Sequence, residues 1–117
     1  MATPFDPNTG TPVSKADALA WIEKYDSERR LDKNVDTKSI FFGKDVLLKM
    51  LDGQGAGITF FLGLKYSDLA KKDVVNLILV PTTEDGTLLW DAAGLSAKAA
   101  DDGAYDVGTP CPPYCPK

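Results

Sequence analysis

Apolar residues recur at helical intervals near the start of the chain, at Ala18, Trp21, Ile22 and Tyr25. Residues spaced three or four positions apart share one face of a helix. Ser14 and Asp17 precede this stripe with the spacing of a capping box, in which Asp replaces the usual Glu or Gln. The pattern predicts a helix over residues 15–30.

A short strand and a second helix are predicted in the next segment. Residues 39–42 form a β-branched and aromatic run, and Gly43 follows it as a candidate N-cap. The helix would carry one apolar stripe, made of Val46, Leu47, Met50 and Leu51. Gly53 is placed to end this helix, because glycine adopts the backbone conformation that closes helices.

Two longer strands are expected in the middle of the chain. Residues 57–64 alternate, with Ile58, Phe60, Leu62 and Leu64 on one face. This alternation predicts a central strand with at least one deeply buried face. Residues 73–80 are almost continuously apolar, which predicts a strand covered on both faces. An Asp-Gly turn signal at Asp85 indicates that residues 88–90 return as a short strand.

These elements predict an α+β fold. We expect a small mixed sheet of three to four strands with two helices packed on it, its strand order left open. The segment between residues 39 and 64 is long enough for a right-handed parallel crossover. The chain divides into an extended proline-rich leader (1–13), a single α+β domain (14–99) and a Pro/Cys-rich C-terminal tail (100–117). The prolines of the tail are also expected to keep it extended.

Composition narrows the class of protein. A chain of 117 residues with 44% hydrophobic and 26% charged residues is typical of one soluble globular domain. The net charge of −4 opposes binding to nucleic acid and to anionic membranes. No stretch reaches the apolar length of a membrane span and no targeting leader is recognisable, so the predicted location is the cytoplasm.

Histidine is absent from the sequence. Its loss removes the side chain that most often serves as general acid, general base and metal ligand near neutral pH. No nucleophile motif replaces it. We therefore expect a protein that is not an enzyme and has no cofactor. A further hypothesis is an enzyme that uses a pair of Asp or Glu side chains, since such pairs form in space rather than in sequence. Asp101 and Asp102 are adjacent in the sequence, but neighbours on a strand point to opposite faces.

Both cysteines lie in the tail, at Cys111 and Cys115. Three states remain open. Two free thiols are the favoured state. A local disulfide comes second, because it requires the two Cα atoms to lie within about 7 Å of each other. A tight turn with a cis bond before Pro112 or Pro113 would bring them that close. A metal site is third, because the spacing is half of a zinc site, which Asp106 or a second copy of the chain would have to complete.

The tail is also the predicted interaction segment, comprising Pro110, Cys111, Pro112, Pro113, Tyr114 and Cys115. The leading hypothesis is a non-catalytic protein–protein interaction or self-assembly module, with a protein partner or other copies of itself in a homo-oligomer. The alternative is a thiol-based binding protein that uses Cys111 and Cys115 for a metal ion or a switchable disulfide.

Residues 40–44, 57–63 and 77–82 together with the Cys-Pro-Pro-Tyr-Cys end resemble small bacterial proteins with an Ile-Phe-Phe-Gly-Lys segment and a Cys-Pro-Pro-x-Cys tail. No established activity accompanies that family. The resemblance implies a bacterial intracellular domain and no catalytic residue.

Overall fold

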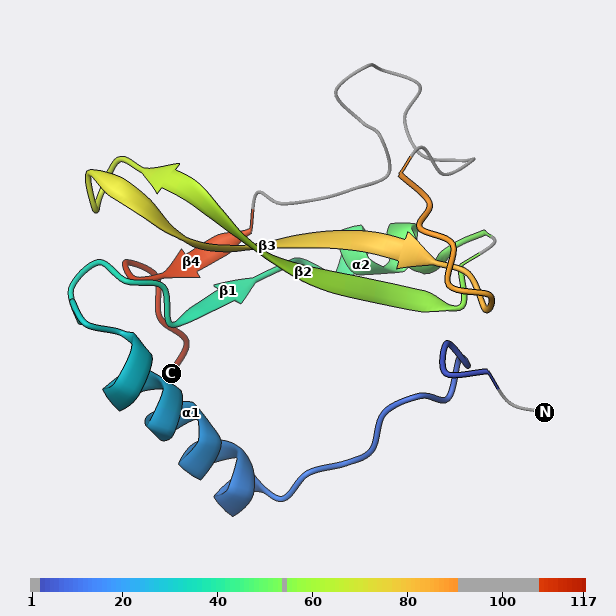
Figure 1. Cartoon of the computed structure of the whole chain (residues 1–117), viewed down its shortest axis with the longest axis horizontal. Coiled ribbons are helices and arrows are strands. Elements are labelled where there is room, and N and C mark those ends of the chain that lie inside the picture. The colour runs from blue at the N-terminus through green and yellow to red at the C-terminus, as the bar shows by residue number, and fades with distance from the viewer. Residues whose placement is uncertain (1–2, 54, 91–107) are drawn as a thin grey trace.

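The computed structural model describes residues 3–53, 55–90 and 108–117, and within these ranges the fold is α+β (Figure 1). The described residues form two helices and four strands: α1 (Lys15–Arg29), β1 (Ser39–Phe41), α2 (Lys44–Leu51), β2 (Gly57–Ser67), β3 (Lys72–Thr82) and β4 (Thr109–Cys111). In place of the expected single mixed sheet, the strands form two antiparallel pairs, β1 with β4 and β2 with β3.

Helix α1 confirms the predicted helix in both position and cap. The Ser14 side chain accepts a hydrogen bond from the backbone N–H of Asp17 at 3.1 Å. However, α1 buries none of its residues, and Trp21 on its apolar stripe is 63% exposed. The helix therefore forms where its sequence predicts, but the expected packing of its apolar stripe against the sheet is absent among the described residues.

Helix α2 packs against the β2–β3 pair and contributes Met50 to the core. It begins after Gly43 and ends before Gly53, whose φ of +107° suits glycine. Met50 is 1% exposed and lies in the same core as Leu79 and Val80. Neither described helix has the length and apolar character needed to cross a membrane.

The β2–β3 hairpin is the longest element of the fold. Its register runs from Gly57 opposite Thr82 to Ser67 opposite Lys72, so both strands extend beyond the predicted bounds. A four-residue loop joins them, and Ser67 O accepts a hydrogen bond from the backbone N–H of Lys71 at 2.8 Å. Lys71 has a φ of +60°, the left-handed conformation that commonly ends such loops.

The burial predicted for this hairpin is largely wrong. In β2, Phe60, Leu62 and Leu64 are 54%, 77% and 73% exposed, although the alternation predicted a buried face. In β3, burial is confined to its last four residues, Leu79–Thr82. The reason is that side chains on the two faces of a sheet are buried only where another layer packs on them, and among the described residues no element covers most of the hairpin.

Strand β1 pairs with the C-terminal segment instead of joining β2 through a parallel crossover. Ser39 lies opposite Cys111 and Phe41 opposite Thr109, and Lys38 N donates to Cys111 O at 2.6 Å. The expected strand at residues 88–90 is reduced to one bridge between Leu88 and Thr82. The Cα radius of gyration is 15.9 Å, above the value of about 13 Å for a compact domain of about 100 residues.

We expect Gly108→Ala to lower the free energy of unfolding by about 1–3 kcal/mol, because overpacking forces neighbouring groups apart. A Cβ at Gly108 would lie 2.5 Å from Ile40 Cγ2 and 2.8 Å from Phe41 O, a backbone atom that cannot easily move. Gly57→Ala is the control, since nothing lies within 4 Å of its Cβ position. Urea unfolding followed by tryptophan fluorescence measures both variants; equal stabilities would contradict the packing at Gly108.

Candidate interaction surface

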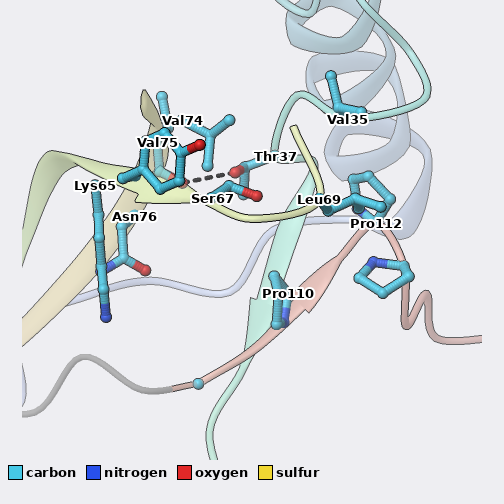
Figure 2. A pocket seen from close by; sticks show the side chains of 13 residues that line it. Val35, Thr37, Lys65, Ser67, Leu69, Val74, Val75, Asn76, Pro110 and Pro112 are labelled. Atoms are coloured by element: carbon cyan, nitrogen blue, oxygen red, sulfur yellow. Dashed lines mark hydrogen bonds between the residues drawn. The ribbon is translucent and has the colours of Figure 1, made fainter. Parts of the chain in front are cut away.

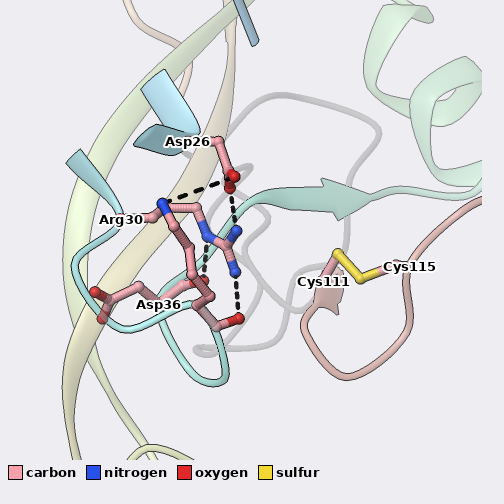
Figure 3. The surroundings of a disulfide bond; sticks show 6 residues. Asp26, Arg30, Asp36, Cys111 and Cys115 are labelled. Atoms are coloured by element: carbon pink, nitrogen blue, oxygen red, sulfur yellow. Dashed lines mark hydrogen bonds and ion pairs between the residues drawn. A yellow bond between two sulfur atoms is a disulfide. The ribbon is translucent and has the colours of Figure 1, made fainter. Parts of the chain in front are cut away.

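The C-terminal segment carries both cysteines, Cys111 at the end of β4 and Cys115 in the turn that follows (Figure 3). Cys111 is 2% exposed where it ends β4. Beyond it the chain turns, and the backbone N–H of Tyr114 donates to Pro110 O at 3.0 Å. Pro110, Pro113 and Cys115 are exposed and Tyr114 is 68% exposed, while Cys111 is buried and Pro112 half-buried, so most of the predicted interaction segment is accessible.

Cys111 and Cys115 form a disulfide, with their Cα atoms 4.6 Å apart. Of the three open states, the local disulfide is therefore confirmed, and the favoured pair of free thiols is wrong. The prolines were expected to extend the segment, but it forms a turn, with the bonds before Pro112 and Pro113 both cis. The described residues hold no group of three or more potential metal ligands. Asp101, Asp102 and Asp106 lie outside the described residues.

A small cavity lies where the tail meets the hairpin (Figure 2). Its volume is about 190 Å³, and Val35, Leu69, Val75 and Pro112 are among its lining residues. Thr37 also lines the cavity, and its Oγ1 donates a hydrogen bond to Val75 O at 2.6 Å. Pockets for small organic ligands usually have volumes of about 300–1,000 Å³. The cavity is therefore better described as a packing gap between the tail and the hairpin than as a ligand site.

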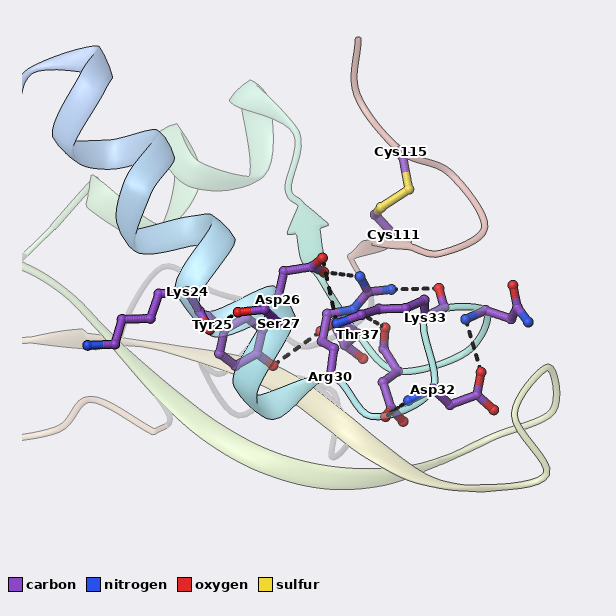
Figure 4. A network of polar contacts seen from close by, with 12 residues as sticks. Lys24, Tyr25, Asp26, Ser27, Arg30, Asp32, Lys33, Thr37, Cys111 and Cys115 are labelled. Carbon is purple, nitrogen blue, oxygen red and sulfur yellow. Dashed lines mark hydrogen bonds and ion pairs between the residues drawn. A yellow bond between two sulfur atoms is a disulfide. The ribbon is translucent and has the colours of Figure 1, made fainter.

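Arg30 organises the loop that leads into β1 (Figure 4). Its side chain is only 6% exposed, and each nitrogen of the guanidinium donates a hydrogen bond. Nε donates to Asp36 O and Nη2 to Lys33 O, each at 2.8 Å, and Nη1 bonds the carboxylate of Asp26. This role of Arg30 was not predicted from the sequence, although the four-residue spacing of Asp26 and Arg30 is the usual signal for an ion pair on a helix.

The charges around this loop shift the pKa of two carboxyl groups. The hydrogen bond from Arg30 holds the pKa of Asp26 below its ordinary value, and the charge of Lys33 adds to this effect. The ammonium of Lys72, 2.8 Å from Asp36, lowers the pKa of Asp36, helped by the backbone N–H of Asp32. Asp36 in turn raises the pKa of Lys72. These groups stabilise one another as charged pairs.

Many large apolar side chains on α1 and β2 are exposed. Large side chains that are more than a third exposed include Leu19, Trp21, Ile22 and Tyr25 on α1 and Phe60, Phe61, Leu62, Leu64 and Tyr66 on β2. Tyr25 and Leu62 line a common groove of about 240 Å³, which links the two sets. On the other face of the hairpin, Phe61 stacks on Trp90 with ring centroids 6.1 Å apart. Extended apolar surface of this kind marks interaction sites.

No protein-family model matches the chain, and neither a curated protein nor a solved structure is significantly similar to it. The resemblance to small bacterial proteins stays a prediction. Function is therefore inferred from the geometry of the described residues.

Asp26→Asn is expected to reduce the dependence of the free energy of unfolding on pH. Because the pKa of Asp26 is lower in the folded chain than in the unfolded chain, its ion pair adds stability above about pH 4 and loses it as the pH falls through the folded pKa. The variant should be less stable than wild type at neutral pH and approach it below pH 4. Glu28→Gln, also on α1, is the charge-matched control. A destabilisation by Asp26→Asn that is constant over this pH range would contradict the assignment.

Opening the disulfide should lower the free energy of unfolding by about 2 kcal/mol, the chain-entropy value for so small a loop. Cys115→Ser does this while keeping the buried Cys111 side chain. Under reductant, wild type and variant should have equal stability. Mass spectrometry should find the reduced wild type about two daltons heavier than the oxidised wild type. A wild type whose stability and mass do not respond to reductant would contradict this prediction.

Proposed function

We propose that this protein is a non-catalytic protein–protein interaction or self-assembly module. The observation that carries the proposal is the apolar surface of α1 and β2, where Trp21, Leu62 and Leu64 are 63%, 77% and 73% exposed. Burying one leucine side chain in an interface is favourable by about 1.5–3 kcal/mol. Several such residues lie on neighbouring elements, so an interface here would gain from burying many of them at once.

The exposed part of the tail supports the same proposal. Pro113 and Tyr114 are displayed on a loop that the disulfide closes at its base and that β4 anchors to β1. A loop held in one conformation loses little entropy on binding. Tyrosine is also enriched at interfaces, because its ring is apolar and its hydroxyl remains able to hydrogen-bond. The tail would thus form a second contact surface.

The prominent charged groups have structural partners, which further favours a binding role over catalysis. Arg30 is enclosed by Asp26 and the carbonyl groups of its loop, while Asp36 is paired with Lys72. A catalytic acid or base needs to reach a substrate. These side chains are committed to holding the loop before β1.

Sedimentation velocity across a wide concentration range tests the proposal. We expect species larger than the 12.6 kDa monomer, with a population that rises with concentration. Leu64→Ser should weaken this association about tenfold or more, as loss of one buried leucine implies. Leu31→Ser is the control, since Leu31 is 88% exposed and lies outside both surfaces. A strict monomer that also captures no partner in pull-downs would overturn the proposal.

The second candidate function is a redox-dependent clip, that is, a disulfide that opens and closes the tail with the redox state. The Cys111–Cys115 disulfide favours it. A reducing cytoplasm, the location that the sequence predicts, would convert this pair to thiols. The tail would then lose its closure while β4 kept its pairing with β1. The same sedimentation series under reductant separates the candidates: association that changes with redox state supports the clip, and identical profiles overturn it.

A further inference from the structure

Two carbonyl groups of β3 reveal how the backbone of the hairpin is oriented. Thr37 Oγ1 donates to Val75 O, and the backbone N–H of Leu89 donates to Pro81 O at 2.9 Å. Both donors lie outside the hairpin. In an antiparallel pair, the N–H and C=O of one residue point either both toward the partner strand or both away from it. Val75 and Pro81 therefore point away from β2, which also suits proline, because it has no N–H to offer the ladder.

The register transfers this orientation to β2. Leu64 lies opposite Val75 and Ile58 opposite Pro81, so both direct their backbone groups to the outer edge of β2. Every second residue does the same, namely Ile58, Phe60, Leu62, Leu64 and Tyr66. Among the described residues, no backbone hydrogen bond joins this edge to another segment. A long apolar edge of this kind is a template for another strand.

We propose that the occupant of this edge is a second copy of the same chain, paired antiparallel through β2 with the two-fold axis at Leu62. The two hairpins would then form one four-stranded sheet in the order β3, β2, β2, β3. This inference rests on the proposed function and names its mode: self-assembly by strand addition.

The sequence of β2 is self-complementary about Leu62. Full overlap of two copies of β2 (Gly57–Ser67) requires this centre. It places Ile58 opposite Tyr66 and Phe60 opposite Leu64, so that large apolar side chains face one another. Aromatic and branched cross-strand pairs of this kind stabilise sheets.

The other face of the strand fits the same register. Phe61 would lie opposite Gly63, and an aromatic ring covering a cross-strand glycine is a favourable pair. Lys65, the one charged residue in the sequence of β2, would lie opposite Thr59. A register centred on Lys65 would instead oppose two like charges, which destabilises a sheet. Charge therefore disfavours the axis at Lys65, and full overlap of the two strands selects the axis at Leu62.

The assembly would close at two copies. The outer edge of β3 is occupied at Val75 by Thr37 and near its end by the bridge between Thr82 and Leu88. Strand addition is therefore available on β2 and hindered on β3. An isologous contact that uses one edge per copy forms a dimer with no free template for a filament.

Cysteine cross-linking with a short thiol-specific bismaleimide tests the register directly, because both natural cysteines are bound in the disulfide and maleimide capture does not depend on disulfide exchange. Leu62→Cys should form a covalent dimer, since paired Cα atoms across the axis are about 5.5 Å apart. Ile58→Cys alone and Tyr66→Cys alone should not, because each would lie about 27 Å from its copy, eight positions at about 3.4 Å each. A mixture of the two should link.

Leu62→Lys supplies an independent readout, since it places like charges on the axis and should weaken association at least about tenfold. Leu69→Lys in the hairpin loop is the matched control and should leave association unchanged. Cross-linking in the predicted pattern supports the inference. Association without that pattern overturns this interface while self-assembly stands, and a monomer in all measurements overturns both the interface and self-assembly.

Discussion

The antiparallel ladder between β2 and β3 is the interaction on which the rest of this structure depends. Helix α2 packs on it through Met50, Thr37 reaches it at Val75, and the loop before β1 is held to it by the ion pair of Asp36 with Lys72. Each of these contacts fixes another segment relative to the hairpin. The ladder thereby positions the tail, because β4 pairs with the strand that this loop delivers.

Local signals in the sequence predicted the elements well. Ser14 starts α1, Gly43 and Gly53 bound α2, and the apolar runs gave both long strands within a few residues. These features depend on neighbours in the chain, on capping hydrogen bonds and on side-chain periodicity. Such interactions are encoded where they act, so a single sequence is enough to predict them.

Burial and pairing could not be predicted in the same way. The alternation in β2 shows which residues share a face, but whether Leu62 is covered depends on elements distant in sequence. The pairing of Ser39 with Cys111 joins segments far apart in the chain. For the tail, the composition favoured extension, whereas the structure has a turn that carries the disulfide. The tail was predicted to be an interaction segment from the sequence alone, whereas the exposed apolar side chains of α1 and β2 were not predicted.

The two sulfur atoms of the disulfide have unequal surroundings. Cys111 is enclosed by the fold, while Cys115 is exposed. Thiol–disulfide exchange requires an incoming thiolate to approach one sulfur in line with the bond, so access decides which sulfur is attacked. An external thiolate will therefore add to Cys115 and release Cys111 as the leaving group. A mixed disulfide with a small thiol or a partner will form at residue 115, outside the fold.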